Sequence, residues 1–178
     1  MGFVATPSTQ NVKIGVCNVN YNSVDLGYTK GGVEVEVTTD THEVMIDQFG
    51  NTPISEYING RQVIVRCPLA ETTLDNMVSI MPGATKITDA TDTASIKVVV
   101  TPGVGSNLLS LAQKLILHPS GLTTADVTED FVVPLAGTAG AIRFAYKLDE
   151  ERVYNIEFKA YPDSGNILFI FGDETATA

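Results

Sequence analysis

The stretch that decides the fold reads Val33-Glu34-Val35-Glu36-Val37-Thr38-Thr39. Valine alternates with acidic residues, and successive side chains of a β-strand point to opposite faces, so this stretch predicts a half-buried strand. The polar residues 39–42 predict a turn, and residues 43–47 alternate again as the second strand of one hairpin. The residues expected in the core from this hairpin are Val33, Val35, Val37, Val44 and Ile46.

A long loop, a strand and one helix are expected after this hairpin. Residues 49–59 contain glycine, asparagine and proline and predict the loop, and residues 61–67 predict the strand. Residues 70–81 predict the helix, because Glu71 lies in the first turn, where the helix dipole favours an acid, and Pro82-Gly83 follows. One apolar stripe along this helix consists of Ala70, Leu74, Met77, Val78 and Met81.

The rest of the chain is mainly strand-like. Residues 106–115 fit helical spacing as well. The predicted fold is mainly β: an antiparallel β-sandwich or barrel with one flanking helix, forming one domain over residues 1–178 with short flexible termini. The other expected strands span residues 12–19, 94–101, 114–118, 131–135, 142–148, 152–161 and 166–171.

The composition narrows the class of partners. Charged residues make up only 18 %, hydrophobic residues make up 44 %, and the net charge is −10. A weakly charged surface is typical of a protein that buries much of itself against neighbours, and the acidic balance predicts repulsion of DNA. No apolar run approaches the roughly 20 residues of a membrane span, and no signal peptide is visible. Cys17 and Cys67 are expected as small buried thiols, with a disulfide as the alternative.

Catalytic chemistry finds little support in the sequence. His42 and His118 are expected on the surface or in loops, and no spacing typical of metal, cofactor or nucleophile sites is present. We therefore expect no enzyme activity, no cofactor and no metal site. An acidic pair, Glu34 and Glu36, lies about 7 Å apart along one strand face and leaves a glycosidase as one alternative. A carbohydrate- or receptor-binding sandwich is the second alternative, although the chain has no Trp for an aromatic platform.

One segment has an unusual charge pattern. Residues 31–60 contain six acidic residues and neither Lys nor Arg. In a monomer this pattern indicates a solvated acidic hairpin face. Repeated around the axis of a ring, the same face would line a pore through which DNA passes without adhering.

Several motifs resemble those of the major tail tube proteins of long-tailed bacteriophages. The resemblance covers most of the chain and is clearest between Asp25 and Gly83. The motifs that carry it are Gly27-Tyr28-Thr29-Lys30-Gly31-Gly32-Val33, Asp47-Gln48-Phe49-Gly50-Asn51-Thr52-Pro53, Leu69-Ala70-Glu71-Thr72-Thr73-Leu74-Asp75-Asn76, Leu117-His118-Pro119 and Phe131-Val132-Val133-Pro134-Leu135-Ala136.

The resemblance implies a structural subunit that assembles with itself. Such proteins form hexameric rings whose inner sheets join around a lumen, and the rings stack into a tube in the virion. The implied partners are the tape-measure protein, tail-tip or baseplate proteins, terminator proteins and, in a contractile tail, a sheath. Assembly takes place in the host cytoplasm, and genomic DNA later passes through the lumen without specific binding.

Two groups of residues are assigned on this basis. The loop of residues 49–59 is unusually apolar for a free loop, so we expect it to dock on a neighbouring subunit or ring; the alternative is that it folds back on its own domain. The loop residues expected in that contact are Phe49, Ile54, Tyr57 and Ile58. The residues expected to face the lumen are Glu34, Glu36, Glu43 and Asp47.

Overall fold

The computed structural model describes residues 12–177, so the expected flexibility of the two ends falls mostly outside the described residues. It is mainly β, as the sequence predicts. The elements are β1 (Cys17–Tyr21), β2 (Val24–Asp25), β3 (Glu34–Val44), the 3-10 turn η2 (Asp47–Phe49), β4 (Ser55–Leu69), α1 (Leu74–Ile80), β5 (Ala84–Thr88), β6 (Ile96–Val100), β7 (Gln113–Pro119), β8 (Phe131–Thr138), β9 (Tyr154–Tyr161) and β10 (Ile170–Phe171).

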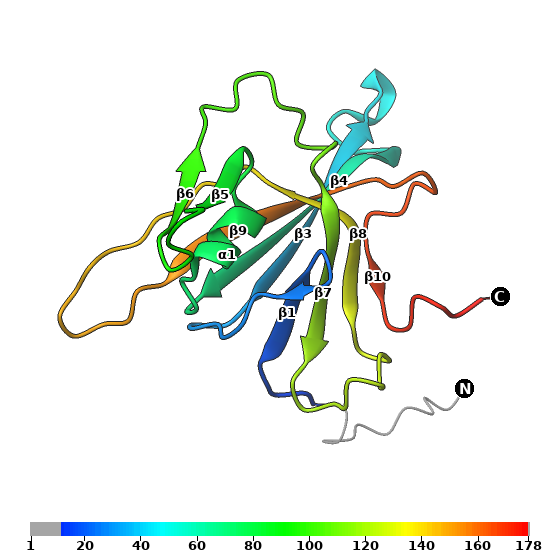
Figure 1. Cartoon of the computed structure of the whole chain (residues 1–178). Coiled ribbons are helices and arrows are strands. Elements are labelled where there is room, and N and C mark those ends of the chain that lie inside the picture. Colours follow the sequence, from blue (N-terminus) through cyan, green and yellow to red (C-terminus); the bar gives the residue numbers. More distant parts are fainter. Residues whose placement is uncertain (1–11, 178) are drawn as a thin grey trace.

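One antiparallel sheet folds over itself to make the two layers of a sandwich (Figure 1). Its strand order is β2-β1-β7-β8-β9-β4-β3, and β10 pairs with β8. Strand β8 connects the layers, because its residues 131–136 pair with β7 whereas residues 135–138 pair with β9. Strand β3 is therefore left at one end of the sheet.

The core lies between these layers. Val19 and Leu115 enter it from one layer, and Val65 and Phe158 enter it from the other. The ring of Tyr21 lies 4.9 Å from that of Phe158, centroid to centroid. Each fully buried apolar side chain of this size contributes about 1.5–3 kcal/mol, so the core holds the two layers together.

Helix α1 is shorter than the predicted residues 70–81. Its N-cap is Thr73, whose side chain accepts a hydrogen bond from the Asn76 backbone N–H, and this cap fixes the first turn. Residues 70–72 are not helical. Glu71 therefore lies outside the helix, and its carboxylate accepts a hydrogen bond from the Tyr28 backbone N–H. Ile80 is buried, and the ribbon of β5 and β6 lies beside the helix (Figure 1).

The predicted short hairpin is wrong. Strand β3 continues through residues 39–42, with a register shift against its partner β4 between Asp40 and Thr41. Threonine favours strands, so the polar stretch extends the strand instead of turning it. The chain turns at η2 and Gly50, where φ is +61° and glycine is favoured. The predicted loop of residues 49–59 is thus partly strand, because β4 begins at Ser55.

Further strand predictions differ from the structure. Residues 142–148 form no strand although they alternate, residues 12–16 are not strand, and only Ile170–Phe171 of residues 166–171 is strand. Sequence reasoning missed β5. No helix in residues 12–177 is long and apolar enough to cross a membrane.

Candidate assembly surface

Strand β3 presents a free edge. It is 11 residues long and pairs only with β4, so the backbone groups along its other side have no strand partner within residues 12–177. Val35 and Val37 lie opposite the buried Val65 and Val63, which places them on the core side of the sheet. They are nevertheless 37 % and 45 % exposed, and Val35 lines an open groove of about 560 Å³ together with Leu117 and Phe131.

The predicted core of the hairpin is therefore wrong in part. Val33 is half-buried and packs against the core cluster, and Val44 is half-buried. Ile46, like the two exposed valines of β3, is more than one-third exposed. These residues lie along an edge that residues 12–177 do not fully bury.

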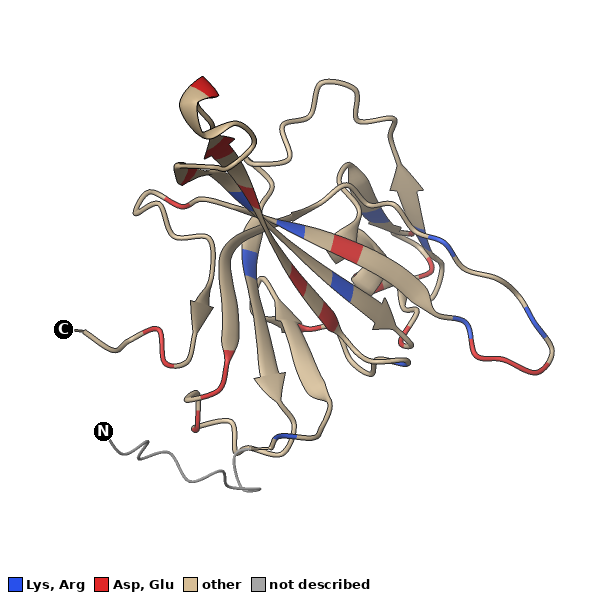
Figure 2. Cartoon of the chain, turned by 180° about the vertical axis from the view of Figure 1, so that it is seen from behind, with Lys and Arg blue, Asp and Glu red and all other residues tan. Residues whose placement is uncertain are grey.

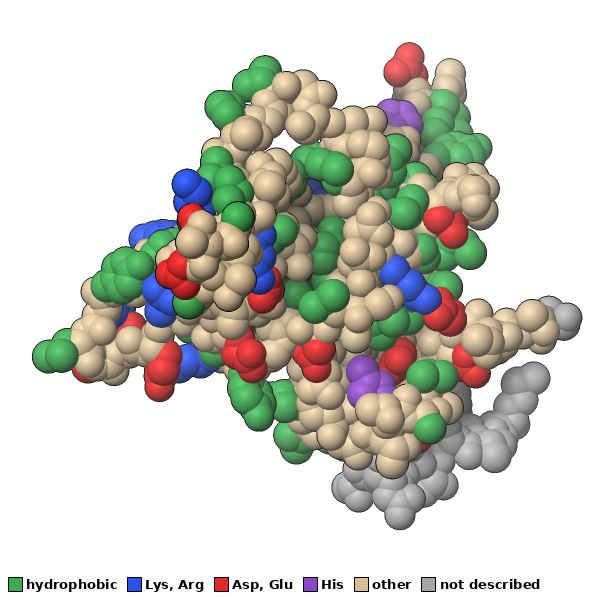
Figure 3. Space-filling view, viewed as in Figure 1, with side chains coloured by type: hydrophobic (Ala, Val, Ile, Leu, Met, Phe, Trp, Pro, Cys, Tyr) green, Lys and Arg blue, Asp and Glu red, His purple; other side chains and the backbone are tan. Residues whose placement is uncertain are grey.

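The tip of the β3–β4 hairpin, residues 45–58, is apolar and exposed. Figure 3 shows hydrophobic side chains on this projection at the upper right. The tip does not fold back on its own domain, since the predicted contact residues all remain at least half exposed. The exposed apolar residues of the tip are Met45, Ile46, Phe49, Ile54, Tyr57 and Ile58.

The outer face of β3, β4 and β9 carries charges of both signs (Figure 2). Arg66 Nη1 lies 2.7 Å from Glu36 Oε2 and 3.6 Å from Glu34 Oε2. Arg66 Nε lies 3.7 Å from Glu157 Oε2. The hydrogen bond that Arg66 donates to Glu36 raises the pKa of the Arg66 guanidinium. The acidic face predicted from residues 31–60 is thus partly neutralised by a base from the neighbouring strand.

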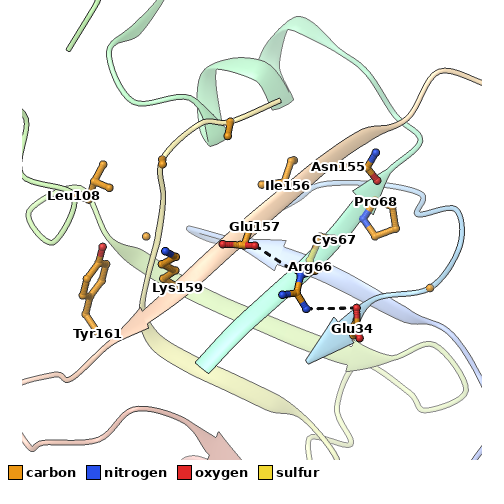
Figure 4. Close-up of a pocket in the computed structure, with 14 residues that line it drawn as sticks. Glu34, Arg66, Cys67, Pro68, Leu108, Asn155, Ile156, Glu157, Lys159 and Tyr161 are labelled. Atoms are coloured by element: carbon orange, nitrogen blue, oxygen red, sulfur yellow. Dashed lines mark ion pairs between the residues drawn. The ribbon is translucent and has the colours of Figure 1, made fainter. Parts of the chain in front are cut away.

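A groove of about 690 Å³ runs along this face (Figure 4). Glu34, Arg66 and Glu157 line one end, and Lys159 and Tyr161 lie farther along it. Leu108 and the chain after β8 form another part of its wall. The groove has no concentration of one charge sign that would select an anion or a cation.

The four acidic residues predicted for the lumen do not share one face. Glu34 and Glu36 lie on the outer face beside Arg66. Glu43 is an odd number of positions from both along the same continuous strand, so it projects from the opposite face. Asp47 lies in the turn η2, beyond the end of β3.

The histidines differ from each other. His42 is exposed on β3 and does not lie in a turn. His118 is mostly buried on β7, with Nδ1 2.7 Å from Oδ1 of the buried Asp130, so its predicted surface position is wrong. This pair fastens the loop before β8 to β7. The sequence spacing of His118 and Asp130 did not predict this pair.

Both cysteines are free thiols. Cys67 is buried, and burial raises the pKa of its thiol from 9.0 to about 12. Burial also raises the pKa of the half-buried Cys17. Among residues 12–177, no group of three His, Cys, Asp or Glu side chains is placed to hold a metal ion.

Comparison with known proteins does not assign a family: no protein-family model and no curated protein matches the chain. The likeness to tail tube proteins therefore stays a prediction from the sequence motifs.

Proposed function

We propose that this chain is the repeating subunit of a bacteriophage tail tube. The observation that carries the proposal is the combination of the free β3 edge with the exposed apolar hairpin tip. A long unpaired edge is an aggregation hazard in a protein that acts as a monomer, and native monomers shield such edges. In a tube subunit the same edge is the surface that closes a ring.

The contact required is heterologous. One edge of a subunit meets a different surface of the next, and rotation closes such contacts into a ring, here proposed as a hexamer. The hairpin tip extends away from the body of the domain (Figure 1) and is available to a neighbouring ring or subunit. Exposed apolar residues grouped in this way are typical of interaction sites. Rings stacked through the tip give a hollow tube around a tape-measure protein.

The outer face of β3, β4 and β9 is the proposed lining of the lumen. It presents Glu34, Glu36 and Glu157 with Arg66 and Lys159, and the chain as a whole has a net charge of −10. A lining with more carboxylates than bases repels DNA phosphates weakly, so the genome passes without adhering. The proposed role includes no catalysis.

Negative-stain electron microscopy of the concentrated full chain tests this function. Hollow rings or tubes of constant diameter are the expected result. Solid fibrils would indicate uncontrolled edge pairing, and the proposal would fail. Monodisperse monomers that bind sugars on a glycan array would instead favour the carbohydrate-binding alternative.

A further inference from the structure

A projecting arm, residues 139–153, connects β8 to β9 (Figure 1, left). Its residues 142–148 alternate like a strand: one side has apolar residues at every second position, and the other carries Arg143, Ala145 and Lys147. No backbone–backbone hydrogen bond is made by residues 141–153 within the described chain. The arm thus combines the sequence pattern of a strand with unused backbone donors and acceptors. The apolar side consists of Ile142, Phe144, Tyr146 and Leu148.

The base of the arm is fixed to the domain. Arg152 Nε and Nη2 donate to Thr72 Oγ1 at 2.9 and 2.7 Å. The guanidinium lies within 6 Å of the ring of Tyr154 on β9 and of two rings of the arm itself, Phe144 and Tyr146. Lys30 forms an ion pair with Glu151. Ile142 packs against the core cluster, Phe144 packs against Tyr154, and Lys147 forms an ion pair with Glu150 of the same arm. The outer part of the arm is open, since Tyr146 is 81 % exposed and Leu148 is fully exposed. Such an anchored projection presents an extended segment to another molecule.

The free β3 edge matches this segment in pattern and charge. Its outer side carries Glu36 and Asp40, four residues apart, and the basic residues Arg143 and Lys147 have the same spacing. Its core side carries the exposed Val35 and Val37, which Tyr146 and Leu148, the most exposed apolar residues of the arm, would cover. Opposite charges on paired strands stabilise the pairing, and buried apolar side chains add to it.

We infer that residues 142–148 of one copy add as a strand along β3 of a second copy. This inference rests on the proposed function, because it names the two surfaces that meet between subunits. The arm and the hairpin tip extend to opposite sides of the domain in both Figure 1 and Figure 2. Within one chain, β4 separates β9, where the arm ends, from β3. We place the contact between copies, head to tail.

Reversing the charges of the arm and of the β3 edge, each in a separate variant of the full chain, tests the inference. The arm variant carries Arg143→Glu and Lys147→Glu, and the edge variant carries Glu36→Lys and Asp40→Lys. Each alone places like charges on the two paired strands, so the concentration needed for assembly rises at least about tenfold, measured by light scattering. An equimolar mixture restores opposite charges in both contacts and returns the threshold to near the wild-type value. Circular dichroism checks that both variants fold.

A matched control and a cross-link sharpen the test. Lys86→Glu with Lys97→Glu makes the same charge change on β5 and β6 and should leave the threshold unchanged. Ala145 lies midway between the two arm bases and Thr38 midway between the two edge acids. Mixed Ala145→Cys and Thr38→Cys variants should therefore form a disulfide-linked dimer, whereas Val104→Cys, at a 95 % exposed position on another loop, should not link to Thr38→Cys.

The outcomes separate this inference from the proposed function. Tubes with a wild-type threshold in the arm variant, or no rescue in the mixture, would overturn the arm contact and leave the tube proposal standing. Oligomers that depend on the arm charges but never form tubes would support the contact and refute the tube. A chain that stays monomeric at every concentration and gives no cross-link would overturn both.

Discussion

Arg66 of β4 donates a hydrogen bond of 2.7 Å to Glu36 of the edge strand β3. This pair joins the free edge to the interior of the sheet on the proposed lumen face. Both side chains are substantially exposed, so the pair adds little to the stability of the fold. Its main effect is on the charge of that face, where one base offsets the carboxylates around it.

The charge of the lumen face can be changed without touching the edge. Glu157 lies on β9, inside the sheet, so Glu157→Lys should leave tube assembly intact. The lining then attracts DNA phosphates, and genome delivery should slow, measured as the kinetics of DNA release from phage particles that carry the variant. Glu174→Lys makes the same charge change near the C-terminus. Equal release kinetics for wild type and Glu157→Lys would place this face outside the lumen.

The hairpin tip should be needed for assembly and dispensable for folding. Phe49 and Ile54 are exposed and lie outside the strands, so Phe49→Ser with Ile54→Ser removes apolar contact area without breaking β3 or β4. Thermal unfolding of the monomer should be unchanged, whereas tubes should be absent or much shorter by electron microscopy. Val104→Ser, at an exposed apolar position elsewhere, is the control. Tubes of normal length in the double variant would exclude a docking role for the tip.

The helix depends on a buried amide. Asn76 is only 6 % exposed, and its Nδ2 donates to the carbonyls of Leu26 and Glu71 at 2.8 Å each. Asn76→Ala leaves both carbonyls without this donor and should lower the free energy of unfolding by about 1–3 kcal/mol, measured by urea denaturation. Ser79→Ala on the exposed side of α1 should change it by far less. Equal effects of the two substitutions would contradict this account.

Cys67 should be unreactive in the folded chain. At pH 8.5 its thiol stays protonated, because burial raises its pKa from 9.0 to about 12, and only the thiolate reacts readily. In a Cys17→Ser background, alkylation should be slower than in urea by roughly two orders of magnitude or more. Similar rates in both conditions would show that Cys67 is accessible.

The same burial links stability to pH. The thiol has a higher pKa when folded than when unfolded, so its contribution to stability is complete below about pH 9 and is lost as the pH rises towards 12. Cys67→Ser should flatten this part of the pH profile of urea denaturation.

Alternation in the sequence predicted the two faces of β3 but not their surroundings. The first residues of β3, Glu34 to Val37, divide into outer acids and core-side valines as expected, whereas Glu43 does not follow this division. The free edge leaves those valines exposed, and no local pattern reveals where a sheet ends. The contact of Arg66 with Glu36 depends on the register of β3 with β4. This register could not be predicted from the sequence, because the turn predicted at residues 39–42 pairs residues 33–39 with residues 43–47 instead. Residues 142–148 alternate like a strand but form none, because a strand needs a hydrogen-bonded partner and residues 12–177 supply none for this segment.

The most direct test of the tube proposal is a cryo-electron microscopy reconstruction of the assembled full chain. The account predicts stacked rings around an open lumen, with the face that carries Arg66 and Glu157 lining it and the β3 edge covered by the next subunit. A solid fibre, or a tube with that face on its outer surface, would contradict the account.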